Sequence, residues 1–221
     1  MNEDLKNHIL KTGTSTVGLV CKNGVVVAGD RKATLGGQIV ASKNAPKVYQ
    51  VNDYIIMSIT GNASDAQMAI RIVAAQLKLK ELRDKIRPTI KESASFIATY
   101  YYQAIRQPSV IPTVVGSLVG GFNEDGSTEL YSVMPDGSIE KIKDYDANVS
   151  SGMPYILGLL ERQYKKDLSV EDAVKLAMEC IKSSSERDTA SGYGIDVFTI
   201  TKDGIKHAIK QKSEAVYSER D

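Results

Sequence analysis

Short runs of β-branched and other apolar residues dominate the first quarter of the chain. Asn23-Gly24 separates the first two runs, and this pair is typical of a tight hairpin turn. Asn52-Asp53 separates the last two runs in the same way. The spacing predicts antiparallel sheet, with strands at residues 14–21, 25–28, 38–41, 47–51 and 54–60.

Apolar residues then recur at helical spacing. Ser64-Asp-Ala-Gln67 has the form of a helix capping box, and the apolar positions behind it predict a helix that ends at about Asp84. Pro88 is typical of a first helical turn and opens a second pattern that continues to Ile105. Two further helices are predicted at residues 154–164 and at residues 169–184, the latter capped by Ser169.

The remaining strands are separated by turn residues such as Pro135-Asp-Gly137. They are predicted at residues 114–122, 129–133, directly after Gly137, 194–201 and 205–209. The order is strands, two helices, strands, two helices, strands, without a Pro/Gly-rich linker or a repeat of about 20 to 50 residues. This order predicts one domain of stacked sheets covered by helices, in which the first and last strands share a sheet.

Composition narrows the possible functions. The chain has 221 residues, of which 42% are hydrophobic and 25% charged, as in ordinary globular proteins. No apolar run approaches the roughly 20 residues of a membrane-spanning helix, so no membrane partner is expected. Lys and Arg total 28 against 27 Asp and Glu, giving a net charge of +1. No net field therefore attracts the chain to nucleic acid.

The thiols and imidazoles are too few for a metal or haem site. The chain has two cysteines, Cys21 and Cys180, and two histidines, His8 and His207, without metal-ligand spacing. Both thiols are interpreted as small buried apolar groups, and no metal or cofactor is expected. The charged first eight residues lack the apolar segment of a signal peptide, which favours the cytoplasm.

The junction between the charged N-terminal segment and the first strand is Gly13-Thr14. Taken alone, it also fits a flexible tail that meets a strand of high β-propensity. Five motifs in order make the junction more specific: Thr12-Gly-Thr-Ser-Thr-Val-Gly18, Ala28-Gly-Asp-Arg-Lys-Ala-Thr34, Thr60-Gly61, Ser150-Ser-Gly-Met-Pro154 and Arg187-Asp-Thr-Ala-Ser-Gly192. Together they resemble the prokaryotic, archaeal-type β subunits of the 20S proteasome, from Gly13 to about Ile209.

The resemblance implies an α+β fold, the four-layer αββα sandwich of the N-terminal-nucleophile hydrolases. It also implies a threonine endopeptidase in which the Thr14 hydroxyl is the nucleophile and its free α-amine, with an ordinary pKa of about 7.7–8.0, is the base. That amine is released when the hydroxyl attacks the carbonyl of Gly13, which lacks a Cβ and leaves the carbonyl open. Residues 1–13 would then be a propeptide removed by autocleavage, and residues 14–221 a single peptidase domain.

By the same resemblance, Asp30 and Lys47 lie beside Thr14, where the ammonium stabilises the alkoxide and the carboxylate holds the ammonium in place. Lys43 is the rival lysine, because the loop before Lys47 is one residue longer than is typical of the family. Pro46 also stands where a second lysine is common. We prefer Lys47, since Lys-Val-Tyr-Gln-Val matches the family's lysine at the head of a strand.

The remaining site residues are likewise implied by the resemblance. The N–H of Gly61 would serve as an oxyanion donor, and a polar cluster around the amine would comprise Ser151, Asp188 and Ser191. An extended peptide would pair with Thr34, Gly61 and Ala63. The first side-chain pocket would have Ile59 as its floor and Ala33 and Ala63 as its walls, which predicts cleavage after apolar or aromatic residues.

The resemblance also bears on the partners of the chain and on its alternative functions. The resemblance implies a seven-membered ring of β subunits, α subunits, an ATP-dependent unfoldase and unfolded polypeptide as substrate. The main alternative is a catalytically silent ring subunit that retains its leader, although a scaffold has no need of these site residues. Another N-terminal-nucleophile amidohydrolase, such as the smaller bacterial threonine peptidase, is a third reading. No Gly-x-Ser-x-Gly elbow or phosphate loop is present.

Overall fold

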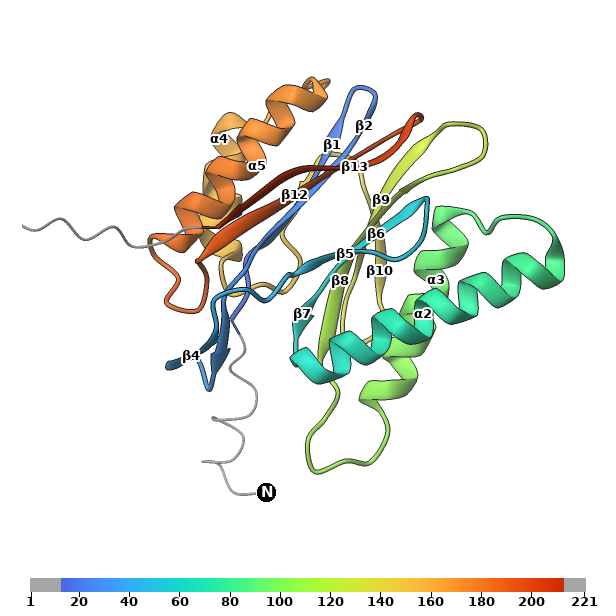
Figure 1. Ribbon diagram of the computed structural model, residues 1–221, viewed down its shortest axis with the longest axis horizontal. Helices are drawn as coiled ribbons and strands as arrows, with labels where there is room; N and C mark the ends of the chain where they lie inside the picture. The colour runs from blue at the N-terminus through green and yellow to red at the C-terminus, as the bar shows by residue number, and fades with distance from the viewer. Residues whose placement is uncertain (1–12, 213–221) are drawn as a thin grey trace, which may run out of the picture.

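A computed structural model describes residues 13–212 and contains two large antiparallel sheets with helices on their outer faces (Figure 1). The first sheet has the order β11-β1-β2-β12-β13. Its strands are β1 (Thr16–Cys21), β2 (Gly24–Asp30), β11 (Tyr145–Asp146), β12 (Gly194–Thr201) and β13 (Gly204–Lys212). The N- and C-terminal strands therefore share a sheet, as expected, with Asp30 opposite Ile195 in the β2–β12 pair.

The second sheet has the order β10-β9-β8-β6-β5. Its strands are β5 (Val48–Gln50), β6 (Ile55–Ser58), β8 (Val115–Phe122), β9 (Thr128–Val133) and β10 (Ile139–Ile142), and the short β7 (Thr60–Gly61) pairs with β8. A separate hairpin is formed by β3 (Ala33–Leu35) and β4 (Ile39–Ser42). The helices among residues 13–212 are α2 (Ala63–Asp84), α3 (Ile90–Ile105), α4 (Met153–Gln163) and α5 (Val170–Ser185).

Strand β2 contributes side chains to two apolar clusters, one on each face of the first sheet. Val25 and Val27 pack between the sheets against Leu118 of β8, whereas Val26 and Ala28 face α4 and α5. This alternation follows from the two-residue period of a strand, and burial of both faces explains the continuous apolar run. A third cluster fills the space between α2, α3 and the second sheet. The resulting order of helices, sheet, sheet and helices confirms the predicted fold class (Figure 1).

The helix termini correct two sequence predictions. Helix α2 is capped by Asn62, whose side chain accepts a hydrogen bond from the Ser64 backbone, so the predicted Ser64 capping box is wrong. Helix α3 begins at Ile90 rather than Pro88, and its capping box is formed by Thr89 and Glu92. In both cases a neighbouring residue offers the better-placed acceptor. The predicted cap of α5, in contrast, is confirmed, because Ser169 accepts from the Asp172 backbone.

Two strands were not predicted because they are very short. Strand β3 has three residues and β11 has two, which is too few to display an alternating pattern. The β3–β4 turn contains Gly36 and Gly37, both at positive φ. Within residues 13–212, none of the helices is both long enough and apolar enough to cross a membrane.

Candidate active site

Thr14 lies two residues before the start of β1, and only 3% of its surface is exposed. The Thr14 hydroxyl donates a hydrogen bond of 2.7 Å to the Gly13 carbonyl oxygen. A Cβ on Gly13 would lie 1.7 Å from the Ala190 Cβ, so only glycine fits at this position. The chain therefore packs the hydroxyl of Thr14 beside the carbonyl group that precedes it.

Lys47 reaches the same two oxygen atoms. It stands one residue before β5, and its Nζ donates at 3.0 Å to the Thr14 Oγ1 and at 3.0 Å to the Gly13 carbonyl. Burial lowers the pKa of the Lys47 amine, against the opposing influence of the charges of Asp30 and Asp188. The Nζ of Lys43 instead lies 5.2 Å from the ring centroid of Tyr193. Of the two candidate lysines, Lys47 is the one that contacts Thr14.

Asp30 ends β2 and is fully buried. Its carboxylate accepts hydrogen bonds from three backbone N–H groups, those of Ser15 at 3.0 Å, Lys32 at 2.9 Å and Gly192 at 3.0 Å. Burial raises the pKa of Asp30 to about 6, although the charge of Lys47 and the three hydrogen bonds oppose the rise.

The contact expected between Asp30 and Lys47 takes another form. Within residues 13–212, no nitrogen–oxygen distance of 4.0 Å or less joins the two side chains. The Asp30 carboxylate is instead turned toward the backbone N–H groups that surround it. Its charge favours the ammonium form of Lys47 across a longer distance, because such attraction is weakly screened in a buried site. Asp30 thus acts on the ammonium through its charge and not through a direct ion pair.

Three further predicted residues form one hydrogen-bonded cluster next to the Thr14 nitrogen. That backbone N–H donates to the Ser151 Oγ at 2.9 Å. The Ser151 hydroxyl donates to the Asp188 Oδ2 at 2.6 Å, and the Ser191 hydroxyl donates to the same oxygen at 2.6 Å. Asp188 also accepts from the Ala190 backbone at 3.1 Å. The loop after α5 thus holds a carboxylate that fixes the orientation of both serines.

Two residues missed in the sequence complete this cluster. Ser15 is fully buried, its hydroxyl lies 2.6 Å from that of Ser191, and its backbone donates to Asp30. Gly152 donates its N–H to the Thr14 carbonyl at 3.2 Å, and a Cβ there would lie 2.0 Å from the Ser15 Oγ. Both residues belong to motifs that the sequence shows, but a serine in a β-branched run gives no signal of a long-range contact.

The residues predicted to bind substrate are placed on neighbouring elements. Ile59 is buried, and its N–H donates to the Lys47 carbonyl at 2.9 Å. Gly61 has φ of +92°, and a Cβ there would lie 1.9 Å from the Val114 oxygen, so its backbone shape requires glycine. The remaining three residues lie in β3 (Ala33, Thr34) and at the start of α2 (Ala63). Within the described residues, none of the five is hydrogen-bonded to Thr14 itself.

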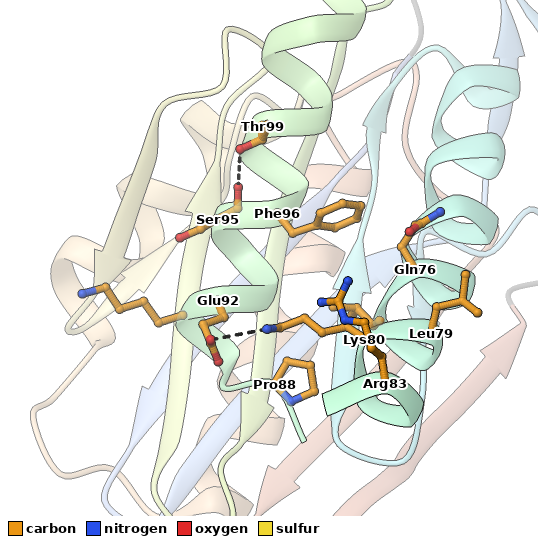
Figure 2. A pocket seen from close by; sticks show the side chains of 11 residues that line it. Gln76, Leu79, Lys80, Arg83, Pro88, Glu92, Ser95, Phe96 and Thr99 are labelled. Atoms are coloured by element: carbon orange, nitrogen blue, oxygen red, sulfur yellow. Dashed lines mark hydrogen bonds and ion pairs between the residues drawn. The ribbon is translucent and has the colours of Figure 1, made fainter. Parts of the chain in front are cut away.

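A large groove of about 930 Å³ lies away from this cluster, between α2 and α3 (Figure 2). Its wall contains the apolar side chains of Leu79 and Phe96, and the Lys80 Nζ lies 3.7 Å from the Glu92 Oε1 across it.

In residues 13–212, the structure has no group of three His, Cys, Asp or Glu side chains placed to hold a metal ion. The cluster around Thr14 is built from hydroxyl, amine, carboxylate and backbone groups.

Comparison with known proteins identifies the family. The model for proteasome subunits matches residues 10–200. A protein named proteasome subunit beta from Archaeoglobus profundus is 40% identical over 216 residues, which cover 97% of this chain and 96% of that protein. Proteins of the same name from Methanocaldococcus jannaschii and Ferroglobus placidus are each 39% identical, over 88% and 92% of this chain and 84% and 94% of their own lengths. The chain belongs to the proteasome subunit family and is a relative of its archaeal β subunits.

Proposed function

We propose that this chain is a threonine-type endopeptidase of a proteasome core particle, which hydrolyses unfolded proteins to short peptides. One observation carries the proposal: the Thr14 hydroxyl lies between the Lys47 Nζ at 3.0 Å and the preceding carbonyl oxygen at 2.7 Å. Membership in the family supports a proteolytic role and assembly with other subunits. The histidine among residues 13–212, His207, lies in β13 and contacts Asp196, so it is not given a role in the reaction.

The first reaction would be cleavage of the chain itself. The Thr14 oxygen attacks the carbonyl carbon of Gly13 and loses its proton, the Gly13–Thr14 C–N bond breaks, and the departing nitrogen gains a proton. An ester on the Thr14 oxygen and a free amine result. Water then hydrolyses the ester and releases residues 1–13. Lys47 donates to the Gly13 carbonyl oxygen and would stabilise the negative charge that forms there. Apart from Gly13, the proposed propeptide lies outside the residues that the structure describes.

The second reaction would repeat this chemistry on a bound peptide. The new α-amine takes the hydroxyl proton, the oxygen attacks the substrate carbonyl, and the proton passes to the departing amine. Hydrolysis of the acyl ester restores Thr14. The cluster of Ser151, Asp188 and Ser191 would orient the amine, because Ser151 already accepts from the same nitrogen in the uncut chain. The N–H of Gly61 is the proposed oxyanion donor.

Intact mass separates this proposal from the silent-subunit alternative. The chain is co-expressed with its α subunit, the assembled particle is purified, and the mass of the β chain is measured. Loss of residues 1–13 is the expected result, since the hydroxyl, the lysine and the scissile carbonyl are already in contact. A full-length β chain in an assembled particle would instead support a ring subunit without catalytic function.

Substrate preference gives a second prediction. Ile59, Ala33 and Ala63 are the proposed lining of the first side-chain pocket and carry no charge. The assembled particle should therefore cleave fluorogenic peptides faster after leucine or tyrosine than after arginine. The values of kcat/KM are compared at one salt concentration with peptides that differ only in this residue. Faster cleavage after arginine contradicts the proposed pocket.

The acidic limb of the pH profile gives a third prediction. Because burial raises the pKa of Asp30 to about 6, its carboxylate predominates above that pH and is neutralised below it. Neutral Asp30 accepts the backbone hydrogen bonds of Ser15, Lys32 and Gly192 more weakly, which loosens the segments around Thr14, so self-cleavage should slow as the pH falls from 7 to 5. Loss of the leader is followed by mass in assembled particles. The uncut chain has no free α-amine at Thr14, so that group cannot produce the limb, and an equal rate at both pH values contradicts the assignment.

The proposed peptidase would act as part of a larger assembly. Family membership supports assembly into a core particle with other subunits. We propose in addition a seven-membered ring of β subunits, contact with an α ring, an ATP-dependent unfoldase that delivers unfolded polypeptide, and action in the cytoplasm.

A further inference from the structure

Arg31 is a buried cation next to the candidate active site. It follows Asp30 at the end of β2, and only 3% of its surface is exposed. Its guanidinium forms an ion pair with Asp196 of β12, which is 1% exposed. Asp196 is also bonded to the His207 Nε2 at 3.0 Å, and the His207 ring stacks on Phe198. The reaction proposed above gives none of these residues a role.

The contacts of Arg31 reach the segments that carry Ser191 and Lys47. Its N–H donates to the Gly192 carbonyl at 3.2 Å, and the Gly192 N–H returns a bond of 3.0 Å to Asp30. Its carbonyl accepts from Ala45 at 2.9 Å, two residues before Lys47. The guanidinium Nε donates at 3.1 Å to the Asn44 Oδ1, and Nη2 donates to the same atom.

Contacts with other elements hold both ends of the segment from Asn44 to Lys47. The Tyr49 hydroxyl donates to the Pro46 carbonyl at 2.9 Å and the Ile59 N–H to the Lys47 carbonyl at 2.9 Å, whereas Arg31 holds the end at Asn44 and Ala45. The segment lies between the β3–β4 hairpin and β5 and has no regular secondary structure. The Asn44 N–H bonds locally to Ser42, and Asn44 itself is exposed, so the long-range contacts of residues 44 and 45 go to Arg31. The position of the Lys47 ammonium depends on the path of this segment.

We infer that Arg31, fixed by Asp196, is a positioning residue that sets the place of Lys47 through Asn44 and Ala45. The inference rests on the proposed peptidase function and concerns the same site. A planar guanidinium suits this task, because its fork of donors can bind Asp196 and Asn44 together in a fixed geometry. An error of about 1 Å in a reacting group can cost on the order of 100-fold in rate.

Asn44 provides a cleaner test than Arg31, since removal of Arg31 leaves Asp196 buried without its charge partner and threatens folding. Asn44→Ala removes the acceptor at an exposed position, Asn44→Asp keeps it, and Lys43→Ala is the matched control in the same loop. In assembled particles, kcat of Asn44→Ala should fall about tenfold with KM unchanged, while the other two variants stay within about twofold of the wild type. Hydrogen exchange at residues 45–48 should be faster in Asn44→Ala alone.

The results of this experiment test the role of Arg31 separately from the proposed peptidase function. If the wild-type particle is active, unchanged kcat in Asn44→Ala overturns the inference and leaves the peptidase function standing. A rise in KM with unchanged kcat also overturns it, because that result assigns Asn44 to substrate binding. If the wild-type particle is inactive, the proposed function fails, and hydrogen exchange then decides whether Arg31 holds the segment. Unchanged exchange in Asn44→Ala overturns that point as well.

Discussion

Replacing Thr14 with alanine is expected to abolish peptide hydrolysis and to leave residues 1–13 attached to the chain. The change removes the only hydroxyl that contacts both the Lys47 Nζ and the preceding carbonyl oxygen in the described residues. Loss of a covalent nucleophile typically lowers kcat by roughly 10⁴- to 10⁶-fold, which leaves no measurable turnover above background. Intact mass and a fluorogenic peptide assay on particles co-assembled with the α subunit measure both effects.

Thr14→Ser is the matched control, since it retains the hydroxyl and removes one methyl group. It should process its leader and hydrolyse peptide, whereas Thr14→Ala should do neither. Both variants should assemble, because the backbone contacts of residue 14 with Ser151 and Gly152 do not depend on its side chain. Normal processing or turnover in Thr14→Ala contradicts the mechanism, and an inactive, uncut wild-type particle favours the silent ring subunit.

The fold could be predicted largely from local patterns. The first hairpin and the helical spacing after residue 63 are encoded within a few residues, and the structure has both, although the turn residues are Lys22 and Asn23 and Gly24 already belongs to β2. The predicted capping residue failed at α2, because Asn62 competes with Ser64 for the same role at a separation of two residues. Strands of two or three residues, such as β3 and β11, were missed since they are defined by their partner strands and not by their own pattern.

The candidate site could be predicted only where motifs carry it. That Thr14, Asp30 and Lys47 lie near one another is implied by the resemblance of the sequence motifs to the family, and not by the spacing of these residues alone. The pairing of Arg31 with Asp196 joins residues 165 positions apart, and the contact of Ser15 with Ser191 spans 176. Neither pair has a local signal. The acceptor of a buried donor depends on how the whole chain packs. These supporting contacts could therefore not be predicted from the sequence.

Lys47→Met is the variant with the second largest expected effect. Methionine is of similar length and suits a buried position, because Lys47 is only 8% exposed. The change removes the donor to both the Thr14 hydroxyl and the Gly13 carbonyl. Loss of one donor at a developing oxyanion typically costs about 100- to 1,000-fold in rate. Self-cleavage and kcat should therefore fall by at least about that factor, as measured by the rate of leader loss and by peptide turnover.

Stability should move differently from activity in this variant. Burial lowers the pKa of the Lys47 amine, which means that the site disfavours its charged form, and an apolar side chain removes this cost. Loss of the positive charge that stabilises buried Asp30 acts in the opposite direction, so the melting temperature of Lys47→Met should stay close to that of the wild type. Lys43→Met is the matched control, because Lys43 lies over Tyr193 and not at Thr14. If Lys43→Met loses more activity than Lys47→Met, the lysine has been assigned to the wrong position, whereas a stable but inactive Lys47→Met particle places the ammonium in the chemistry and not in the packing.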